Sequence, residues 1–370
     1  MTRTYDDTHF KPSVAETVTV HASLAIAYCQ YASRGARNPE HQAELHNATN
    51  FHYHYALGFF PQLMASHTLA DVQALALLCI FLRNCPKPGA SWMLTSIVLD
   101  LAIELGLHRS ATNWAPSIKR NILEIELRKR VFWSINWIHV LVGGSLGRPM
   151  ALQAGDWDVE VPEAVDDELL SERGLDTSRK GKCGFLAGIE NFKVLPIYMD
   201  LYNIIYAVGA TPPNYEETVR GLERRLQEWH EQWPSEMQDA SAFQSEIGRV
   251  HLQYLHMWRC HVRLLLRHPS LSTTTSAQFN TESLSMCLDT SKELLYHVKM
   301  LQAHRGLDVT WQTSALFVLA IATTLYGRWE RRLQLTVPDF NVLKQDMQDW
   351  LSILSDMDTL LGKNLRVRDV

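Results

Sequence analysis

Apolar residues recur with the 3.6-residue period of an α-helix along almost the whole of this 370-residue chain. Two helix starts are explicit in the sequence. Ser13 with Glu16, and Thr68 with Asp71, are spaced as capping boxes, in which each side chain accepts a hydrogen bond from the other residue's backbone amide. The second start leads into the nearly all-apolar residues 72–82, which on a helix must be buried on every side. The periodicity therefore predicts a chain built from helices.

Two further helices are predicted before the middle of the chain. The first, over 92–105, is expected to end at Gly106, because glycine readily adopts the left-handed conformation that closes a helix. The second is predicted over 118–141, and two pairs of i,i+4 spacing are expected on its exposed face, Glu124–Arg128 and Glu126–Arg130. This helix is expected to end at a group of glycines, Gly143, Gly144 and Gly147.

The C-terminal half is predicted to be helical again, over residues 215–233, 243–265, 284–301 and 315–326 and after Pro338. The run 315–326 is the longest apolar one, but a bilayer needs about 18 to 20 residues, so it predicts a buried core helix. In 215–233 the apolar residues form a near-heptad seam, which could pair with another chain. A dimerisation or scaffold module is therefore one hypothesis, and burial of the seam within the monomer would count against it.

These patterns predict an all-α fold, a multi-layer bundle of about a dozen helices without repeats or alternating strands. Only 18 glycines and 14 prolines occur, which disfavours an all-β fold rich in tight turns. No break in composition divides the chain, so residues 1–370 are predicted to be a single domain. Residues 148–165 are expected to form a long irregular crossing, and flexible loops are expected near 171–184 and 269–280.

Charge and cysteine spacing exclude several classes of site. A net charge of −5 and a pI of about 6.3 are far from the basic balance of a nucleic-acid-binding domain. No two of the six cysteines stand in a C-x-x-C pair, so zinc clusters and redox sites are not predicted. His251, His256 and His261 step by five residues, which does not align them on one helix face, and we predict no metal site.

Five segments in one order carry a resemblance to a known family. They are Thr68–Leu78, Trp92–Leu101, Leu105-Gly106-Leu107-His108-Arg109, Glu126–Trp133 and Leu146-Gly147-Arg148-Pro149. Together they resemble the regulatory domain of fungal transcription factors, also called the middle homology region or the xylanolytic activator regulatory domain. The similarity is clear over residues 48–165, and beyond it only helical content and length agree.

The resemblance implies a helical, effector-responsive domain of the fungal binuclear zinc-cluster regulators, which are nuclear proteins. In that family an N-terminal module of six closely spaced cysteines holds two zinc ions and contacts DNA. The cysteines of this chain cannot form that module. We therefore expect no cofactor in this chain, zinc only in an N-terminal module absent from it, and DNA contact only through that module. A small-molecule effector, a second copy of the chain or the transcription machinery are the expected partners, and no membrane is expected.

The matched motif residues are interpreted mainly as structural: Gly106, His108, Arg109, Arg130, Phe132, Trp133, Gly147, Arg148 and Pro149. His108 and Arg109 lie just beyond the helix closed by Gly106, where they could cap its orphan carbonyls. Arg148 is expected to form a buried bidentate pair with one of Asp156, Asp158 or Asp166. Phe132 and Trp133 are expected to pack in the core.

No catalytic constellation is recognisable, so no catalytic residue is predicted. Large aromatic residues on separate helices could line a pocket for an apolar small molecule, and we predict Trp92, Trp133, Trp258 and Trp311 as ligand-binding residues. The leading hypothesis is a nuclear, effector-sensing regulatory domain rather than an enzyme. The alternative is a stand-alone helical protein that reuses the same pocket as an enzyme or small-molecule binder in secondary metabolism.

Overall fold

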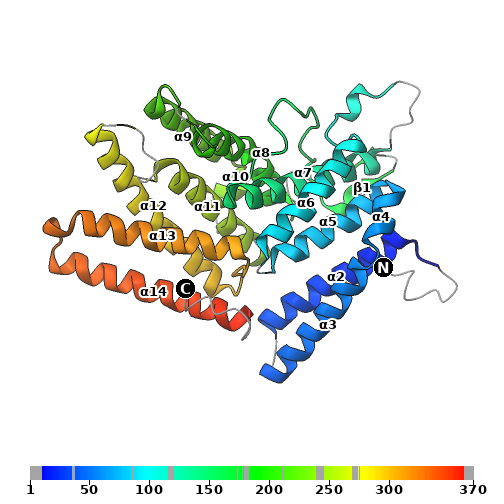
Figure 1. The fold of residues 1–370 in the computed structure, drawn as a ribbon, viewed down its shortest axis with the longest axis horizontal. Coiled ribbons are helices and arrows are strands. Elements are labelled where there is room, and N and C mark those ends of the chain that lie inside the picture. Colours follow the sequence, from blue (N-terminus) through cyan, green and yellow to red (C-terminus); the bar gives the residue numbers. More distant parts are fainter. Residues whose placement is uncertain are drawn as a thin grey trace.

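The computed structural model confirms the predicted all-α class (Figure 1). It describes residues 11–35, 38–85, 87–115, 121–172, 174–176, 178, 183–210, 212–238, 246–268, 274 and 276–361. Within these ranges the only strands are β1 (Leu170–Ser171) and β2 (Gly174–Leu175), which pair antiparallel. None of the described helices combines the length and the apolar character that crossing a bilayer requires.

The N-terminal helices begin where the capping boxes predict. Ser13 N donates to Glu16 Oε2 at 2.8 Å and Glu16 N donates to Ser13 Oγ at 3.2 Å, at the start of α2 (Val14–Arg34). α3 (Pro39–Leu57) runs alongside α2, and the short α4 (Phe60–Ser66) follows (Figure 1). The Thr68 capping box opens α5 (Leu69–Arg83), which packs between α2, α6 and α7 and is buried along most of its length.

α6 (Pro88–Glu104) ends as predicted, because Gly106 takes a φ of +66°. The amides of Gly106 and Leu107 donate back to Ile103 O and Ala102 O, a pattern of closing bonds that needs a left-handed residue. After the short turn η1 (Ala111–Asn113), α7 (Ile122–Ser145) packs against both α5 and α6. Part of the predicted start of α7, residues 118–120, lies outside the described residues.

The predicted break at Gly143 and Gly144 is wrong, because α7 continues through both to Ser145. A Cβ atom at Gly144 would lie only 2.0 Å from Cε2 of Tyr202. Gly144 therefore provides room for a buried tyrosine ring on a neighbouring element. Gly147, with a φ of +63°, follows the helix end.

Replacing Gly144 with alanine is expected to lower the free energy of unfolding by about 1–3 kcal/mol, since the Tyr202 ring must move within a packed core. Urea denaturation of the purified chain measures this. Gly143→Ala is the matched control, because its Cβ would lie 3.6 Å from Trp92 Nε1, an ordinary contact. An equal effect at both positions would contradict this account.

The crossing from Leu146 to Phe185 is irregular over 148–165, as predicted, and then forms η2 (Asp167–Leu169), β1 and β2. Part of the loop predicted near 171–184 lies outside the described residues, namely 173, 177 and 179–182. The loop predicted near 269–280 likewise includes 269–273 and 275, which are not described. Its last residues are helical, because Ser276 already caps α12.

The C-terminal half consists of helices joined by short connections, and their bounds follow: α8 (Leu186–Leu201), the π-helical turn η3 (Tyr202–Tyr206), α9 (Tyr215–Glu231), α10 (Ser235–Gln238), α11 (Glu246–Arg267), α12 (Ala277–Ala303), α13 (Trp311–Glu330), η6 (Arg332–Gln334) and α14 (Val337–Leu361). The predicted start at Phe243 lies outside the described residues. Buried apolar side chains from Ala15 to Met357 form one contiguous core cluster, so both halves share a core.

The seam of α9 is buried within the monomer. Its members, Tyr215, Val219, Leu222, Leu226, Trp229 and Trp233, are all at most 7 % exposed. This counts against the hypothesis that the seam is a dimerisation surface.

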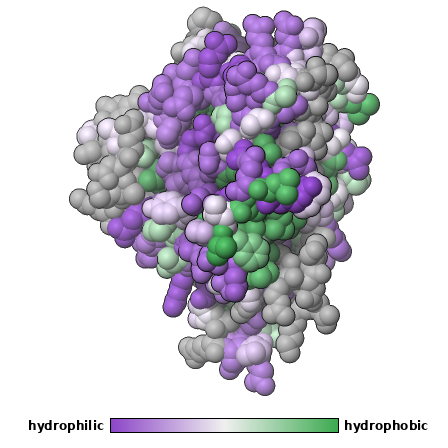
Figure 2. All heavy atoms as spheres, turned by 90° about the vertical axis from the view of Figure 1, so that its left-hand side faces the viewer, coloured by the Kyte–Doolittle hydropathy of each residue, from purple (hydrophilic) through white to green (hydrophobic). Residues whose placement is uncertain are grey.

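α13 is not the fully buried core helix that its apolar sequence predicts. Leu316 and Phe317 face the core, whereas Val318, Leu325 and Trp329 are 44 %, 46 % and 58 % exposed. Figure 2, a view from the side on which α13 and α14 are joined, shows hydrophobic side chains gathered within a mostly hydrophilic face. The helix is apolar on a second side that the rest of the described chain does not cover.

Candidate functional site

The four tryptophans predicted to line one pocket do not come together. Trp92 lies beside Gly143 with the guanidinium of Arg148 over its ring. Trp133 packs against Trp157 and Phe192 and donates from Nε1 to Glu160 O at 3.0 Å. Trp311 begins α13. Only Trp258 lines the pocket described below.

Arg148 does not form the predicted buried pair. It is exposed and rests over the Trp92 ring, 5.6 Å from its centroid. The bidentate pair belongs to Arg109, whose Nε and Nη2 donate to the two carboxylate oxygens of Asp158 at 3.0 and 3.1 Å. The Ser110 amide also donates to Asp158, at 2.7 Å, and together with Arg109 it lowers the pKa of this carboxyl. Arg109 thus fastens the irregular crossing to the end of α6.

The cap at the end of α6 also differs from the expected one. Arg128 Nη2 donates to Leu105 O and Gly106 O at 2.9 and 3.1 Å. Arg128 therefore caps carbonyls at the end of the helix, the role predicted for His108 and Arg109. His108 instead accepts at its backbone carbonyl from the amides of Asp158 and Val159.

Arg130 does not pair with Glu126. It donates to Val165 O and pairs with Asp167, whereas Glu126 is buried and accepts from Lys129 and from the Glu163 amide. Phe132 and Trp133 are buried in the core, as expected for packing residues, and Gly147 and Pro149 are exposed at the loop start. The motif residues therefore hold α6, α7 and the crossing together.

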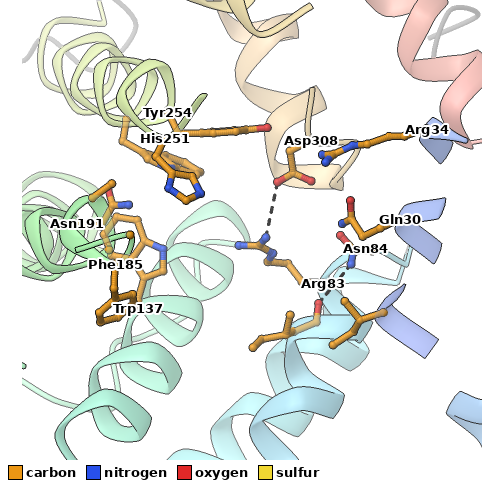
Figure 3. A pocket seen from close by; sticks show the side chains of 16 residues that line it. Gln30, Arg34, Arg83, Asn84, Trp137, Phe185, Asn191, His251, Tyr254 and Asp308 are labelled. Atoms are coloured by element: carbon orange, nitrogen blue, oxygen red, sulfur yellow. Dashed lines mark hydrogen bonds and ion pairs between the residues drawn. The ribbon is translucent and has the colours of Figure 1, made fainter. Parts of the chain in front are cut away.

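A pocket of about 410 Å³ lies where the N-terminal helices meet the C-terminal ones (Figure 3). One side, the polar wall, comes from α2, the end of α5 and the segment before α13; it consists of Gln30, Arg34, Arg83, Asn84 and Asp308. The opposite side, the aromatic wall, comes from α7, α11 and the start of α8; it consists of Trp137, Phe185, Tyr254 and Trp258, with Asn191 and His251 beside them. The volume lies within the range of small-molecule sites.

The polar wall carries two guanidinium groups and one carboxylate. Arg83 Nη2 lies 3.6 Å from Asp308 Oδ2, an ion pair rather than a hydrogen bond, and Arg34 extends toward the same carboxylate (Figure 3). Asp308 accepts from the amide of Thr310 at 3.2 Å, which fixes it at the start of α13. Arg34, Arg83 and Asp308 leave a formal charge of +1 on this wall.

Two buried polar atoms at the pocket have no hydrogen-bond partner among the described residues. They are Nε of Arg83, a donor, and Oδ1 of Asn191, an acceptor. Burying such an atom unpaired costs about 1–3 kcal/mol. The two atoms belong to opposite walls, so the pocket offers an unused donor on one side and an unused acceptor on the other.

The aromatic wall is tightly packed and uncharged. The Trp137 and Trp258 rings meet edge to face at 5.8 Å, and Tyr254 Oη donates to Gly306 O at 2.6 Å. Burial lowers the pKa of His251, partly offset by its hydrogen bond with the Gly184 backbone, so this ring is neutral at pH 7. The wall presents flat apolar surface to anything bound between the two sides.

A second cluster joins α11 to α12. Ligand-type atoms of His256, Glu293 and His297 lie within 4.8 Å of one another. The two imidazole rings, however, are stacked at 4.3 Å with an interplanar angle of 3°, so their in-plane lone pairs run parallel and do not converge on one ion. Glu293 is paired with Arg259, and His297 Nδ1 lies 2.7 Å from Gln253 Oε1.

The environment of this cluster keeps His256 neutral and Glu293 charged. Burial, with His297 and Arg259 close by, lowers the pKa of His256 to about 3. Burial alone would raise the pKa of Glu293, but His297 and Arg259 outweigh it and lower the value to about 2. The cluster is a charged contact between two helices. Spacing along α11 alone could not reveal it, because its other members come from α12.

Comparison with known proteins identifies the class of protein that this fold defines. The sequence profile described as "Fungal specific transcription factor domain" matches residues 5–231, more than half of the chain, and the chain belongs to this family. No solved structure gives a significant match.

Curated relatives are fungal regulators. The chain is 26 % identical over 314 residues to "Activator of stress genes 1" of Saccharomyces cerevisiae, covering 81 % of this chain and 31 % of that protein. It is 28 % identical over 183 residues to the "ABC-transporter-regulating transcription factor" of Aspergillus oryzae, covering 48 % and 20 %. The "Transcriptional activator protein acu-15" of Neurospora crassa is 25 % identical over 212 residues, covering 56 % and 22 %. The chain thus spans about a third or less of these relatives.

Most of the pocket residues escaped sequence analysis. Arg34 and Arg83 stand in the last turns of their helices, where a basic residue is expected in any case, and Asp308 lies in a loop. No signal in the sequence distinguishes these helix-end arginines from ordinary ones. Trp258 could be proposed because it is large and central.

Proposed function

We propose that the chain is the effector-sensing regulatory region of a fungal transcription factor, with the pocket between the polar and aromatic walls as its sensor. The observation that carries this proposal is the pocket's position. Its polar wall comes mainly from α2 and α5, inside the family-matched segment, whereas Tyr254, Trp258 and Asp308 lie beyond residue 231. A ligand held there contacts both parts at once.

This position supports a simple mechanism of control. A small molecule that fits both walls stabilises the arrangement in which α2 and α5 face α11 across the pocket, and a protein that samples two arrangements is shifted toward that one. Helix shifts at such a pocket are a common way of passing a signal on. The proposal places the protein in the nucleus, with DNA contacted through a module outside this chain.

The test combines ligand screening with a variant that fills the pocket. Compounds that bind the folded chain raise its melting temperature, with a stabilisation of about 2.7 kcal/mol at one hundred times Kd. Gln30→Trp places an indole at an exposed lining position of α2, and it is expected to abolish these shifts. Gln227→Trp, on the exposed face of α9 and outside the pocket, is expected to retain them.

A reporter assay then tests the regulatory part. The chain is fused to an unrelated DNA-binding module in a fungal cell, and a compound found in the screen is added. Reporter output is expected to respond with Gln227→Trp and not with Gln30→Trp. Melting shifts that survive Gln30→Trp would place binding elsewhere, and binding without any reporter response would remove the regulatory role.

Replacing Asn191 with leucine is expected to stabilise the free protein by about 1 kcal/mol, because it removes a buried acceptor without a partner at nearly constant volume. Urea denaturation without added ligand measures the change. Such a gain accompanied by weaker ligand-induced melting shifts is the pattern expected of a binding residue. A loss of stability would mean that Asn191 Oδ1 is hydrogen-bonded in the free protein.

A further inference from the structure

We propose that the pocket takes a monoanionic ligand with a carboxylate head and an aromatic body, the head between Arg34 and Arg83 and the body against Trp137 and Trp258. This inference rests on the proposed function of the same pocket and names the chemical class of its ligand.

The polar wall presents donors that suit an anion. Arg83 makes only a 3.6 Å ion pair, and its buried Nε has no acceptor among the described residues. No described residue forms an ion pair with Arg34. A guanidinium presents a planar fork of donors that matches the two oxygens of a carboxylate. One added carboxylate gives Arg83 Nε an acceptor and Arg34 a counter-ion.

Asp308 sets the charge of that ligand. Its carboxylate is held by Thr310 at the start of α13, through the amide at 3.2 Å and the hydroxyl at 3.4 Å, so it stays in the wall. The wall therefore has a formal charge of +1, which one carboxylate neutralises. A phosphate monoester, with about −1.5 to −2 charges at pH 7, would leave excess negative charge beside Asp308.

The opposite wall determines the rest of the ligand. Trp137, Phe185 and Trp258 line it, and the imidazole that lines the pocket beside them, His251, is neutral at pH 7 because burial lowers its pKa. Flat aromatic rings pack well against indole faces and edges. Because the walls face each other (Figure 3), head and body must be carried by one amphipathic molecule.

The experiment compares probes that share a body and differ in the head. Binding of 2-naphthoate, 2-naphthamide, 2-naphthyl phosphate and 2-naphthylmethylammonium to the purified 370-residue chain is measured by titration calorimetry at pH 7. Hydrogen bonds to charged groups contribute about 1.5–3 kcal/mol, so 2-naphthoate is expected to bind roughly tenfold or more tightly than the neutral amide. The phosphate and the ammonium compound are expected to bind more weakly than 2-naphthoate.

Variants assign the preference to the two arginines. Arg83→Gln and Arg34→Gln are each expected to weaken 2-naphthoate about tenfold and to leave 2-naphthamide unchanged. Arg220→Gln is the matched control, because Arg220 pairs with Glu282 on the surface between α9 and α12 and lies outside the pocket. Circular dichroism melts establish that each variant is folded.

Each outcome decides one of the two claims. If 2-naphthamide binds as tightly as 2-naphthoate and Gln30→Trp blocks both, the pocket binds ligands but the carboxylate preference is wrong. Tighter binding of 2-naphthyl phosphate would also overturn it. A preference for 2-naphthoate that survives Arg83→Gln and Arg34→Gln would place the head elsewhere. If no probe binds and no screened compound shifts the melting temperature, the proposed function fails together with this inference.

Discussion

Acidification from about pH 7 to about pH 4.5 is expected to lower the free energy of unfolding by several kcal/mol. Burial lowers the pKa of His139 and of His261 to about 4, and both side chains are less than 9 % exposed. The unfolded chain binds these protons near pH 6.5, whereas the folded chain resists them until about pH 4. Stability is therefore complete above about pH 6.5 and falls as the pH drops from there toward 4, by about 2 kcal/mol for each ring.

Urea midpoints measured across this pH range test the expectation. His139→Leu is expected to flatten the slope by at most about a third, because His261 and also His256, whose pKa is lowered to about 3, contribute over the same pH range. Nδ1 of His139 has no partner among the described residues, so leucine loses no hydrogen bond there. His261→Gln is the second variant. Glu293 does not add to this window, since a carboxyl with a pKa of about 2 loses its contribution only below its usual value of 4.5. Unchanged slopes in both variants would contradict the assignment.

Arg267→Met is expected to destabilise the chain by up to about 3–5 kcal/mol, because Glu223 then keeps only Arg263, 3.5 Å away, as an ion-pair partner. Arg267 is 4 % exposed at the end of α11, where its guanidinium pairs with Glu223 of α9 and lies 4.9 Å from the centre of the Phe279 ring of α12. Its Nη1 also donates to Ser283 Oγ at 3.3 Å. This one side chain connects three helices.

A double-mutant cycle measures the interaction energy between Arg267 and Glu223 separately from the cost of burying each side chain. Arg267→Met combined with Glu223→Met is expected to recover part of the loss, because the second substitution removes the carboxylate that Arg267 neutralised, although Arg263 then loses its own pair with Glu223. Arg225→Met is the control, since Arg225 pairs with Asp200 at the surface with 44 % of its side chain exposed. Its loss is expected to be below about 1 kcal/mol. Additive losses at Arg267 and Glu223 would contradict the role assigned to their pair.

The helices were predictable because their signals are local. Ser13 with Glu16 and Thr68 with Asp71 lie three residues apart and form the hydrogen bonds that their spacing predicts. The end of α6 was predictable from Gly106 for the same reason. The role of Gly144 depends on a distant element and could not be predicted locally: the glycine lies within α7 and leaves room for the Tyr202 ring, 58 residues away.

The site was less predictable, because charge partners and pocket walls are set by packing. Arg109 and Arg148 stand in similar motifs beside a loop with several aspartates. Arg109, rather than Arg148, pairs with Asp158 because of the path that this loop takes in the fold. The size of a tryptophan favours a central position, yet size does not determine which face of a helix meets a cavity. Trp137, four residues after Trp133, lines the pocket, whereas Trp133 packs behind the loop.

The residues that line the pocket are far apart in the sequence, so they are synthesised at different times, and this determines when a ligand can bind. Arg34 and Arg83 are made early, but Trp258 comes much later and Asp308 later still, so the nascent chain carries most of its polar wall long before the other side exists. Contacts between such distant segments form late, because a long loop must first close. On the proposed function, a ligand that needs both walls can therefore bind only the finished chain and not the growing one. A message that stops before codon 308 would still encode the whole family-matched segment. On the proposed function its product would not bind the ligand properly, because the polar wall would lack Asp308.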